Sequence, residues 1–313
     1  EIVSQKPYKE WVDTHTLPLS EVPYTNNTCP IEATKYDTRL RVFGYTLEDI
    51  STVINPMATQ SKEALGSMGI DTPLAVLSDK PQLLYNYFKQ LFAQVTNPPL
   101  DGIREEIITD ISLAIGGDRN IFDIIPEQAK KLRIQNPVIS NDDLDKLKNL
   151  KHPDFKSVVI PMLYPISKGV NGLEKALDDI LVACEMAIFE GANIIILSDR
   201  GLDEDNAPIP ALMACSYVNH SLNKKQKRSK FGIVIESAEP REPHHFATLF
   251  GYGASAINPY LVNEIIRDQV KTNVIKGIDA EVAVRNYNKA IGKGILKIMN
   301  KIGISTLHSY RAS

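Results

Sequence analysis

Cysteine is scarce and widely spaced in this sequence. The 313 residues contain three cysteines, Cys29, Cys184 and Cys215. An odd number at such spacing predicts no disulfide framework, and no two are close enough in sequence to indicate a zinc or iron–sulfur clip. Cys184 and Cys215 lie in apolar stretches with helical spacing, so we expect buried thiols and a reducing, cytoplasmic setting.

Long apolar runs and an excess of charge of one sign are also missing. No run reaches the roughly 18 residues of a membrane span, and no secretory signal is recognisable. The net charge is −3, from 35 Lys and Arg against 38 Asp and Glu. This balance predicts neither a nucleic acid nor a membrane as partner. The chain begins with Glu1 rather than Met, and we expect it to be cut from something longer.

What is present is typical of a globular protein, with 43% hydrophobic and 23% charged residues. The first half is expected to be mostly helix and loop. Residues 1–35 are irregular and proline-containing, which indicates a connector. Thr46 lies three residues before Asp49, as in a helix-capping box. Further expected elements are a short strand at 72–78, an amphipathic helix at 81–95, a segment at 103–116 ambiguous between helix and strand, and a capped short helix at 140–150.

From residue 151 onward, apolar strands alternate with helices. The expected strands are 157–165, 192–199, 230–237 and 254–257, and the expected helices are 171–191, 209–225, 243–250, 259–270 and 279–303, the last in two pieces broken near Gly292 and Gly294. Continuous apolar strands indicate a sheet covered on both faces, and alternation with helices indicates parallel strands. The sequence therefore predicts an α/β fold, either an open sheet or a half-barrel, preceded by a mostly helical N-terminal half.

Polar residues follow two of these strands, where parallel sheets usually place ligands. Asp199 and Arg200 either contact a neighbouring domain or pair within their loop. Glu236 and Arg241 follow the next strand. His244 and His245 are adjacent and would point about 100° apart on a helix, so we expect hydrogen-bonded core histidines rather than a metal site.

Two earlier segments are further candidates. Pro56, Met57 and Ala58 follow a helical pattern, and a Met there can supply a soft contact to a flat ring or pack into the core. A small, polar stretch comes next and predicts either an ordinary loop or one whose backbone amides face an interface or a phosphate. Its candidate residues are Glu63, Ser67 and Asp71.

Several long segments resemble one family in the family's own order. They are KPYKEW (6–11), GYTLEDISTVINPMATQSKEALGSMGIDTPLAVLS (44–78), LLYNYFKQLFAQVTNPPLDGIREE (83–106), ILSDRG (196–201), REPHHFATLFGYGASAINPYL (241–261) and KGILKIMNKIGISTLHSYR (293–311). On these segments the chain resembles the central domain of the glutamate synthase large subunit.

The resemblance implies an oxidoreductase of glutamate biosynthesis and ammonia assimilation. In that family a glutaminase domain releases ammonia, which travels through a tunnel to an FMN domain. There it meets 2-oxoglutarate, and an iron–sulfur cluster supplies electrons. The central domain joins the two catalytic domains and lines part of the route. The resemblance also implies that Pro56, Met57 and Ala58 lie near FMN and 2-oxoglutarate, and that the other candidate residues face an interface or the tunnel.

The same resemblance implies a division of the chain: a connector at 1–35, the central domain at 36–290 with a helical part to 150 and a β/α part from 151, and the start of the FMN domain at 291–313. The implied partners are the glutaminase and FMN domains and, through the parent enzyme, the small subunit or ferredoxin. The chain lacks an N-terminal cysteine nucleophile and a cysteine trio for a cluster, so we expect it to bind no cofactor and to be inactive alone. The alternative is an autonomous α/β domain or small enzyme that binds a phosphate compound or nucleotide.

Overall fold

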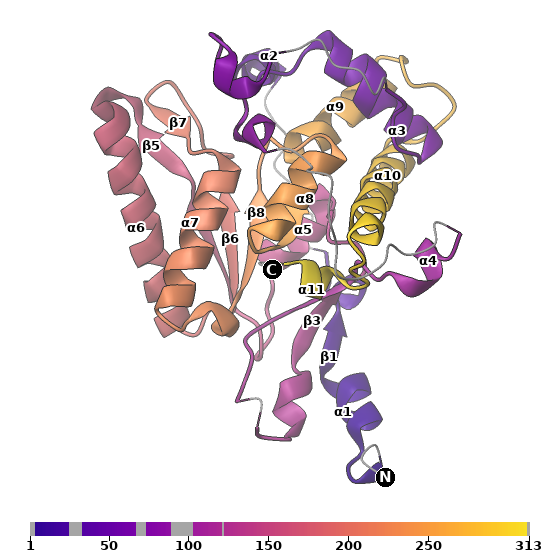
Figure 1. The fold of residues 1–313 in the computed structure, drawn as a ribbon, viewed down its shortest axis with the longest axis vertical. Coiled ribbons are helices and arrows are strands. Elements are labelled where there is room, and N and C mark those ends of the chain that lie inside the picture. Colours follow the sequence, from indigo (N-terminus) through magenta and orange to yellow (C-terminus); the bar gives the residue numbers. More distant parts are fainter. Residues whose placement is uncertain (1–3, 25–32, 67–72, 89–102, 121, 312–313) are drawn as a thin grey trace.

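The computed structural model describes residues 4–24, 33–66, 73–88, 103–120 and 122–311 (Figure 1). The elements before residue 150 are short. They are α1 (Tyr8–His15), β1 (Thr16–Pro18), η2 (Leu19–Glu21), α2 (Ala33–Val42), η3 (Asp49–Ile54), α3 (Asn55–Gln60), η4 (Ala75–Leu77), η5 (Leu84–Tyr87), α4 (Glu105–Ile108), β2 (Leu113–Ile115), η6 (Pro126–Ala129), β3 (Lys131–Ile134) and α5 (Asn141–Lys148). None of the described helices combines the length and apolarity needed to cross a bilayer.

The predicted parallel sheet is confirmed. Its strands are β4 (Ser157–Pro161), β6 (Ile194–Ser198), β8 (Gly232–Glu236) and β9 (Ala254–Asn258). They pair in the order β4-β6-β8-β9, and every pair is parallel. Because the spatial order follows the chain order, the carboxyl ends of all four strands meet at one edge. Both expected alternatives, an open sheet and a half-barrel, contain such a sheet.

Long helices cover one face of this sheet. They are α6 (Gly169–Phe189), α7 (Ala211–Lys224), α8 (Pro243–Gly251), α9 (Tyr260–Lys271) and α10 (Ala280–Lys301). Ile195 and Leu197 of β6 belong to the same buried apolar cluster as Phe246 and Leu249 of α8. These helices match the predicted ones within a few residues, because each has an apolar stripe at helical spacing that the sheet buries.

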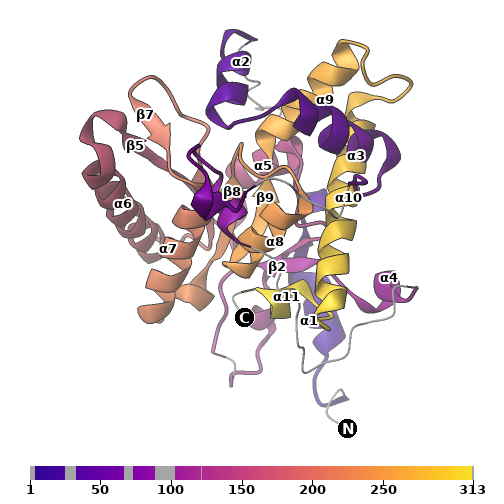
Figure 2. The ribbon, with the colours of Figure 1, turned by 45° about the horizontal axis from the view of Figure 1, so that its top comes forward.

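The other face of the sheet packs on a small second sheet and α5 (Figure 2). In this second sheet β3 lies between β1, its parallel neighbour, and β2, its antiparallel neighbour. Ile194 and Ile196, which alternate with the helix-facing residues of β6, join Leu132 and Ile134 of β3 in a separate core cluster. Burial on both faces explains why the strands of the large sheet read as continuous apolar runs.

Several expectations for the N-terminal half were not confirmed. Residues 36–150 hold two strands, β2 and β3, among their short helices. The run expected as a strand at 72–78 forms the 3-10 turn η4 instead, with residue 72 outside the described part. Residues 81–88 carry the 3-10 turn η5 rather than an α-helix, and the rest of that expected helix, 89–95, also lies outside the described part. The ambiguous stretch at 103–116 contains both a helix, α4, and a strand, β2.

Two further expectations were wrong in detail. The strand expected at 157–165 divides at Met162, and its second half, β5 (Leu163–Pro165), pairs with β7 (Asn206–Pro208) in a separate two-stranded sheet. Helix α10 is continuous through Gly292 and Gly294. A Cβ at Gly294 would lie 2.6 Å from Pro243 Cγ, so α8 approaches α10 too closely for a side chain. Close packing therefore outweighs the low helix propensity of glycine here.

Candidate functional site at the carboxyl ends of the parallel strands

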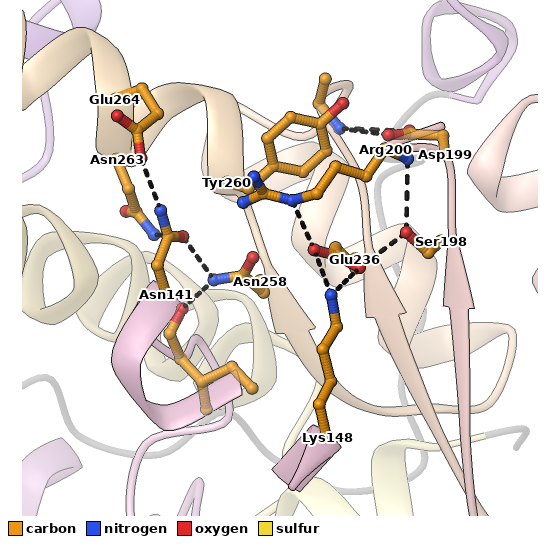
Figure 3. Close-up of polar contacts among 12 residues, drawn as sticks. Asn141, Lys148, Ser198, Asp199, Arg200, Glu236, Asn258, Tyr260, Asn263 and Glu264 are labelled. Carbon is orange, nitrogen blue, oxygen red and sulfur yellow. Dashed lines mark hydrogen bonds and ion pairs between the residues drawn. The ribbon is translucent and has the colours of Figure 1, made fainter. Parts of the chain in front are cut away.

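The polar residues that follow β6 and β8 lie side by side, as the predicted parallel register requires (Figure 3). Ser198 pairs with Glu236 in the last register position of the two strands. Asp199 and Arg200 continue from β6. All of these residues except Arg200 are buried. The polar groups that follow β6 and β8 therefore meet at one edge of the sheet.

Glu236 is the centre of the arrangement and is fully buried. Its Oε1 accepts a hydrogen bond from Arg200 Nε at 2.7 Å, and its Oε2 accepts one from the Ser198 hydroxyl at 2.6 Å. The ammonium of Lys148, from the last turn of α5, lies 2.7 Å from Oε2. Burial alone would raise the pKa of Glu236, but the two cations outweigh it and lower the pKa. Glu236 is thus an ionised carboxylate between two positive groups.

Asp199 is also fully buried but has no cation at ion-pair distance among the described residues. It accepts hydrogen bonds from the Ser237 hydroxyl at 2.6 Å and from the backbone N–H of Ala238 at 3.1 Å. Burial raises the pKa of Asp199 to about 6 despite these donors. Asp199, which follows β6, is therefore held by the loop after β8 rather than by partners in its own loop.

Arg200 and Tyr260 close this edge toward the N-terminal segment. The guanidinium of Arg200 lies 4.5 Å from the centre of the Tyr260 ring, a cation–π contact (Figure 3). Arg39 of α2 donates to the Tyr260 hydroxyl at 3.2 Å and to the Arg200 carbonyl at 3.0 Å. A helix more than a hundred residues away in sequence thus covers the strand ends.

A third buried carboxylate, Glu239, lies further along the loop after β8. Its Oε2 accepts hydrogen bonds from the Tyr85 hydroxyl at 3.2 Å and from the backbone N–H of Ala211, at the start of α7, at 3.0 Å. Burial raises the pKa of Glu239 to about 7, and the nearby charge of Asp199 adds to the effect. The positive end of the α7 dipole favours a carboxylate at this position.

Arg241 fixes the loop to the segment around Asp49. Its guanidinium donates to the carbonyl of Phe43 at 2.7 Å, to the carbonyl of Gly44 at 3.1 Å and to Asp49 Oδ2 at 3.0 Å. It also lies 3.9 Å from the centre of the Tyr45 ring. A planar guanidinium that both stacks and donates several bonds is a strong positional constraint.

His245 is buried, as expected, and stacks on Tyr85 with ring centres 4.5 Å apart. Its Nδ1 accepts from the backbone N–H of Arg241 at 3.3 Å, which leaves the proton on Nε2. Nε2 lies 3.0 Å from Glu242 Oε1, but the alignment is poor for a hydrogen bond, so we treat this contact as electrostatic. Burial lowers the pKa of His245. His244 contacts the Tyr85 carbonyl through Nε2 at 3.1 Å.

The other candidate residues lie away from this edge. Met57 and Ala58 are fully buried in the main core, and the Ala58 carbonyl accepts a hydrogen bond from Asn286 of α10 at 3.1 Å. Pro56 is half-buried in the first turn of α3. Glu63 forms an exposed ion pair with Lys297 at 3.2 Å. Ser67 and Asp71 lie outside the described residues.

A cavity of about 810 Å³ adjoins this edge. It lies between residues 41–53 and 81–86 on one side and Arg241, Glu242 and His245 on the other. Both terminal nitrogens of Arg241 donate to the segment around Asp49 and so hold the loop. Among the described residues no three His, Cys, Asp or Glu side chains are grouped as metal ligands. The Ser198 and Ser237 hydroxyls each donate to a buried carboxylate, and most donors and acceptors of the arrangement pair with one another, so it is suited to holding segments together.

Sequence reasoning missed the partners of these residues. Lys148, Tyr85 and Arg39 each contact the strand-end loops, but each lies far from them along the chain. The parallel register could indicate which strand ends are neighbours. No spacing pattern indicates which distant helix covers them.

Comparison with known proteins gives one consistent result. The family model described as "Glutamate synthase central domain" matches residues 38–313. The chain is 40% identical over its whole length to the NADPH-type glutamate synthase large chain of Bacillus subtilis, and spans 20% of that protein. It is 37% identical over 98% of its length to ferredoxin-dependent glutamate synthase 2 of Synechocystis, again 20% of that protein. Among solved structures, a mutant flavocytochrome b2 with benzoylformate aligns with 54% of this chain and 36% of its own, at 14% identity and a TM-score of 0.37, which is too low to support an argument.

Proposed function

Because the chain belongs to the glutamate synthase central domain family, we propose that it connects the glutaminase and FMN domains of a glutamate synthase and lines part of the ammonia route between them. The chain spans about a fifth of the length of the relatives it matches. The glutamate-forming reaction, its FMN and its iron–sulfur cluster then belong to the whole protein. The family match over residues 38–313 is the observation that carries the proposal.

The closed strand-end edge supports a connecting role. In open α/β sheets this edge is where ligands usually bind. Here Arg39 and the segment around Asp49 cover it, and Glu236, Asp199 and Arg241 are engaged with other parts of the chain. The described residues offer neither a cofactor cradle at this edge nor a set of metal ligands. We therefore assign neither FMN nor a cluster to this chain and route no chemical step through them.

Exposed apolar side chains on two sides of the fold also support it. On α6, Val182, Met186 and Phe189 recur at helical spacing and are 54%, 60% and 93% exposed. On and beside α4, Ile103 and Ile107 are 88% and 86% exposed. Helices α6 and α4 lie at opposite sides of the molecule in Figures 1 and 2. Contiguous exposed apolar residues usually mark contact surfaces, and two such faces fit a domain placed between two others.

The test uses the whole enzyme with single substitutions on each face. Phe189→Glu and Ile107→Glu should lower glutamine-dependent glutamate formation more than ammonia-dependent formation, because a loosened domain contact lets ammonia escape. Val274→Glu, at a 59% exposed apolar position after α9, is the matched control. If both face variants lost the same fraction of glutamine-dependent and of ammonia-dependent activity, the tunnel role would be contradicted. Turnover of glutamine or 2-oxoglutarate by the 313-residue chain alone would contradict the connecting role.

The alternative, an autonomous ligand-binding α/β domain, makes a different prediction. It requires a ligand at the strand ends, where Glu236, Asp199 and Arg241 already bind other parts of the chain. Thermal-shift measurements of the isolated chain with FMN, 2-oxoglutarate and nucleotides distinguish the two. A shift of several degrees that Arg241→Lys abolishes would favour the alternative.

A further inference from the structure

A second cavity, of about 550 Å³, lies at the opposite, amino-terminal end of the parallel sheet. Gly232, the first residue of β8, and Ser255 of β9 line it from the sheet. Arg228 lines it from the turn after α7, and His308 and Arg311 line it from α11 (Leu307–Tyr310) and the residue that follows. Its volume falls within the range of small-molecule sites, about 300–1,000 Å³.

Two guanidinium groups at this cavity donate hydrogen bonds to the same uncharged oxygen atom. Arg228 Nη2 and Arg311 Nη2 donate to the same carbonyl, that of Gly253, at 2.8 and 3.1 Å. The remaining hydrogen bonds of Arg228 go to the Asn219 side-chain oxygen and the Phe231 carbonyl. Within the described part of the chain, neither arginine has a carboxylate at ion-pair distance. Two half-buried cations side by side without an anion are unfavourable, and each one lowers the affinity of the other for its proton.

The one acidic side chain on the cavity wall, Asp118, raises the pKa of both arginines but offsets only part of their charge. Asp118 lines the cavity, but it binds Lys131 Nζ at 2.5 Å. Burial and the charge of Arg228 lower the pKa of Arg311 to about 10, so both arginines are nevertheless positive near neutral pH. The cavity therefore carries a net positive charge.

Two polar atoms of residues that line the cavity have no hydrogen-bond partner in the described structure. Ser255 is 1% exposed, and its hydroxyl has no hydrogen-bond partner there. The Nε of Arg311 is likewise buried and unpartnered. Leaving a buried polar group unsatisfied costs about 1–3 kcal/mol, so such groups in a native fold call for a partner. A hydroxyl and guanidinium N–H groups around one space are the donors that bind phosphate oxygens.

We propose that this cavity binds the phosphate group of a small phosphorylated compound, held by Arg228, Arg311 and Ser255. The cavity is much larger than one phosphate, and Asn223, Gln226 and His308 line the space that the rest of such a molecule would fill. This site lies at the other end of the sheet from the closed edge and is independent of the connecting role.

The test is calorimetric titration of the 313-residue chain with inorganic phosphate, ribose 5-phosphate and ribose at low salt. Saturable binding of ribose 5-phosphate but not ribose is expected. Weaker binding of inorganic phosphate would show that the sugar contributes, and equal binding would identify free phosphate as the ligand. Affinity should fall at least about tenfold in Arg311→Gln, since a charge-assisted contact is lost, and several-fold in Ser255→Ala.

The control is Arg285→Gln, which removes an exposed guanidinium of α10 outside the cavity and should leave binding unchanged. Ser255→Ala removes a hydroxyl without a partner, so folding should survive even if Arg311→Gln impairs it. Absence of saturable binding of either phosphate compound would overturn the proposal. Binding that Ser255→Ala and Arg311→Gln leave unchanged would also overturn it. Neither result bears on the activity of a whole glutamate synthase, so the two proposals fail separately.

Discussion

The carboxylate of Glu236 lies 2.7 Å from the ammonium of Lys148, and this contact joins the end of β8 to the last turn of α5. Glu236 is fully buried, whereas the side chain of Lys148 is 28% exposed. Arg200, which follows the neighbouring strand β6, places its Nε 2.7 Å from the same carboxylate. The pair therefore joins α5 to the ends of β6 and β8 through one ionised group.

Substitutions at this pair should have unequal effects on the free energy of unfolding. Glu236→Gln keeps the shape but removes the negative charge, and we expect a loss of about 3 kcal/mol because Lys148 and Arg200 lose their counter-charge. Lys148→Met should cost about 1 kcal/mol or less, since its side chain is partly exposed and Arg200 still neutralises Glu236. Urea unfolding of both variants and of the double variant checks this. Strictly additive losses would show that the two groups are not coupled.

The anchoring of the strand-end loop by Arg241 leads to a second prediction. Arg241→Lys loses the stacking on Tyr45 and most of the donors to Phe43, Gly44 and Asp49, so we expect a loss of about 2–4 kcal/mol.

The matched control is Arg267→Lys. Arg267 is paired with Glu264 at 3.3 Å and Glu281 at 3.0 Å, and its side chain is 25% exposed. A partly exposed pair of this kind should cost less than about 1 kcal/mol. Similar midpoints for the two variants in urea would contradict an anchoring role for Arg241.

Much of the large sheet was predictable because its signals are local. Each strand is a short apolar run, and each crossover helix carries an apolar stripe within its own sequence. The capping box was predictable for the same reason: the Thr46 hydroxyl accepts from the N–H of Asp49 at 3.0 Å, and the Asp49 carboxylate accepts from the N–H of Thr46 at 2.9 Å. Ser140 caps α5 in the same way, by accepting from the N–H of Asp143.

The small sheet was not predictable by such reasoning. Its strands have three or four residues each, and β3 pairs with β1 from more than a hundred residues earlier. Segments this short become strands only when the partner and the covering core are in place. The candidate site shows the same division. Positions of Asp199 and Glu236 follow from strand ends, whereas contacts such as Tyr85 with Glu239 depend on tertiary packing.

The raised pKa of Glu239 predicts a pH dependence of stability. Its pKa rises from 4.5 to about 7 on folding, so the folded state holds a proton that the unfolded state releases in this range. The unfolding free energy should therefore fall as pH rises from about 4.5 to 7, by roughly 3 kcal/mol from this group. Glu239→Gln should remove that fall, and the amide oxygen can still accept from Tyr85 and Ala211.

The measurement is urea unfolding at several pH values from 4.5 to 7.5, with Glu185→Gln as the control. Hydrogen bonds from Lys227 and Lys225 lower the pKa of Glu185, so its stabilising effect is lost only as pH falls below this range. The stability difference between Glu239→Gln and the unsubstituted chain should grow with pH, while that of Glu185→Gln stays flat. A flat difference for both variants would show that Glu239 is not protonated in the fold.

Gly253, in the turn from α8 into β9, provides the last prediction. Its φ of +104° is a conformation that residues with a side chain rarely adopt, and a Cβ there would overlap the side-chain amide of Asn219. Gly277 also has a positive φ, +73°, but no atom lies within 4 Å of a Cβ built on it. Gly277→Ala should thus cost about 1 kcal/mol from the backbone alone, whereas Gly253→Ala must also displace Asn219 from Arg228 and should cost at least about 3 kcal/mol. Thermal unfolding of the two variants side by side measures the difference. Equal losses would mean that Asn219 moves aside freely and that the contact between this turn and α7 is loose.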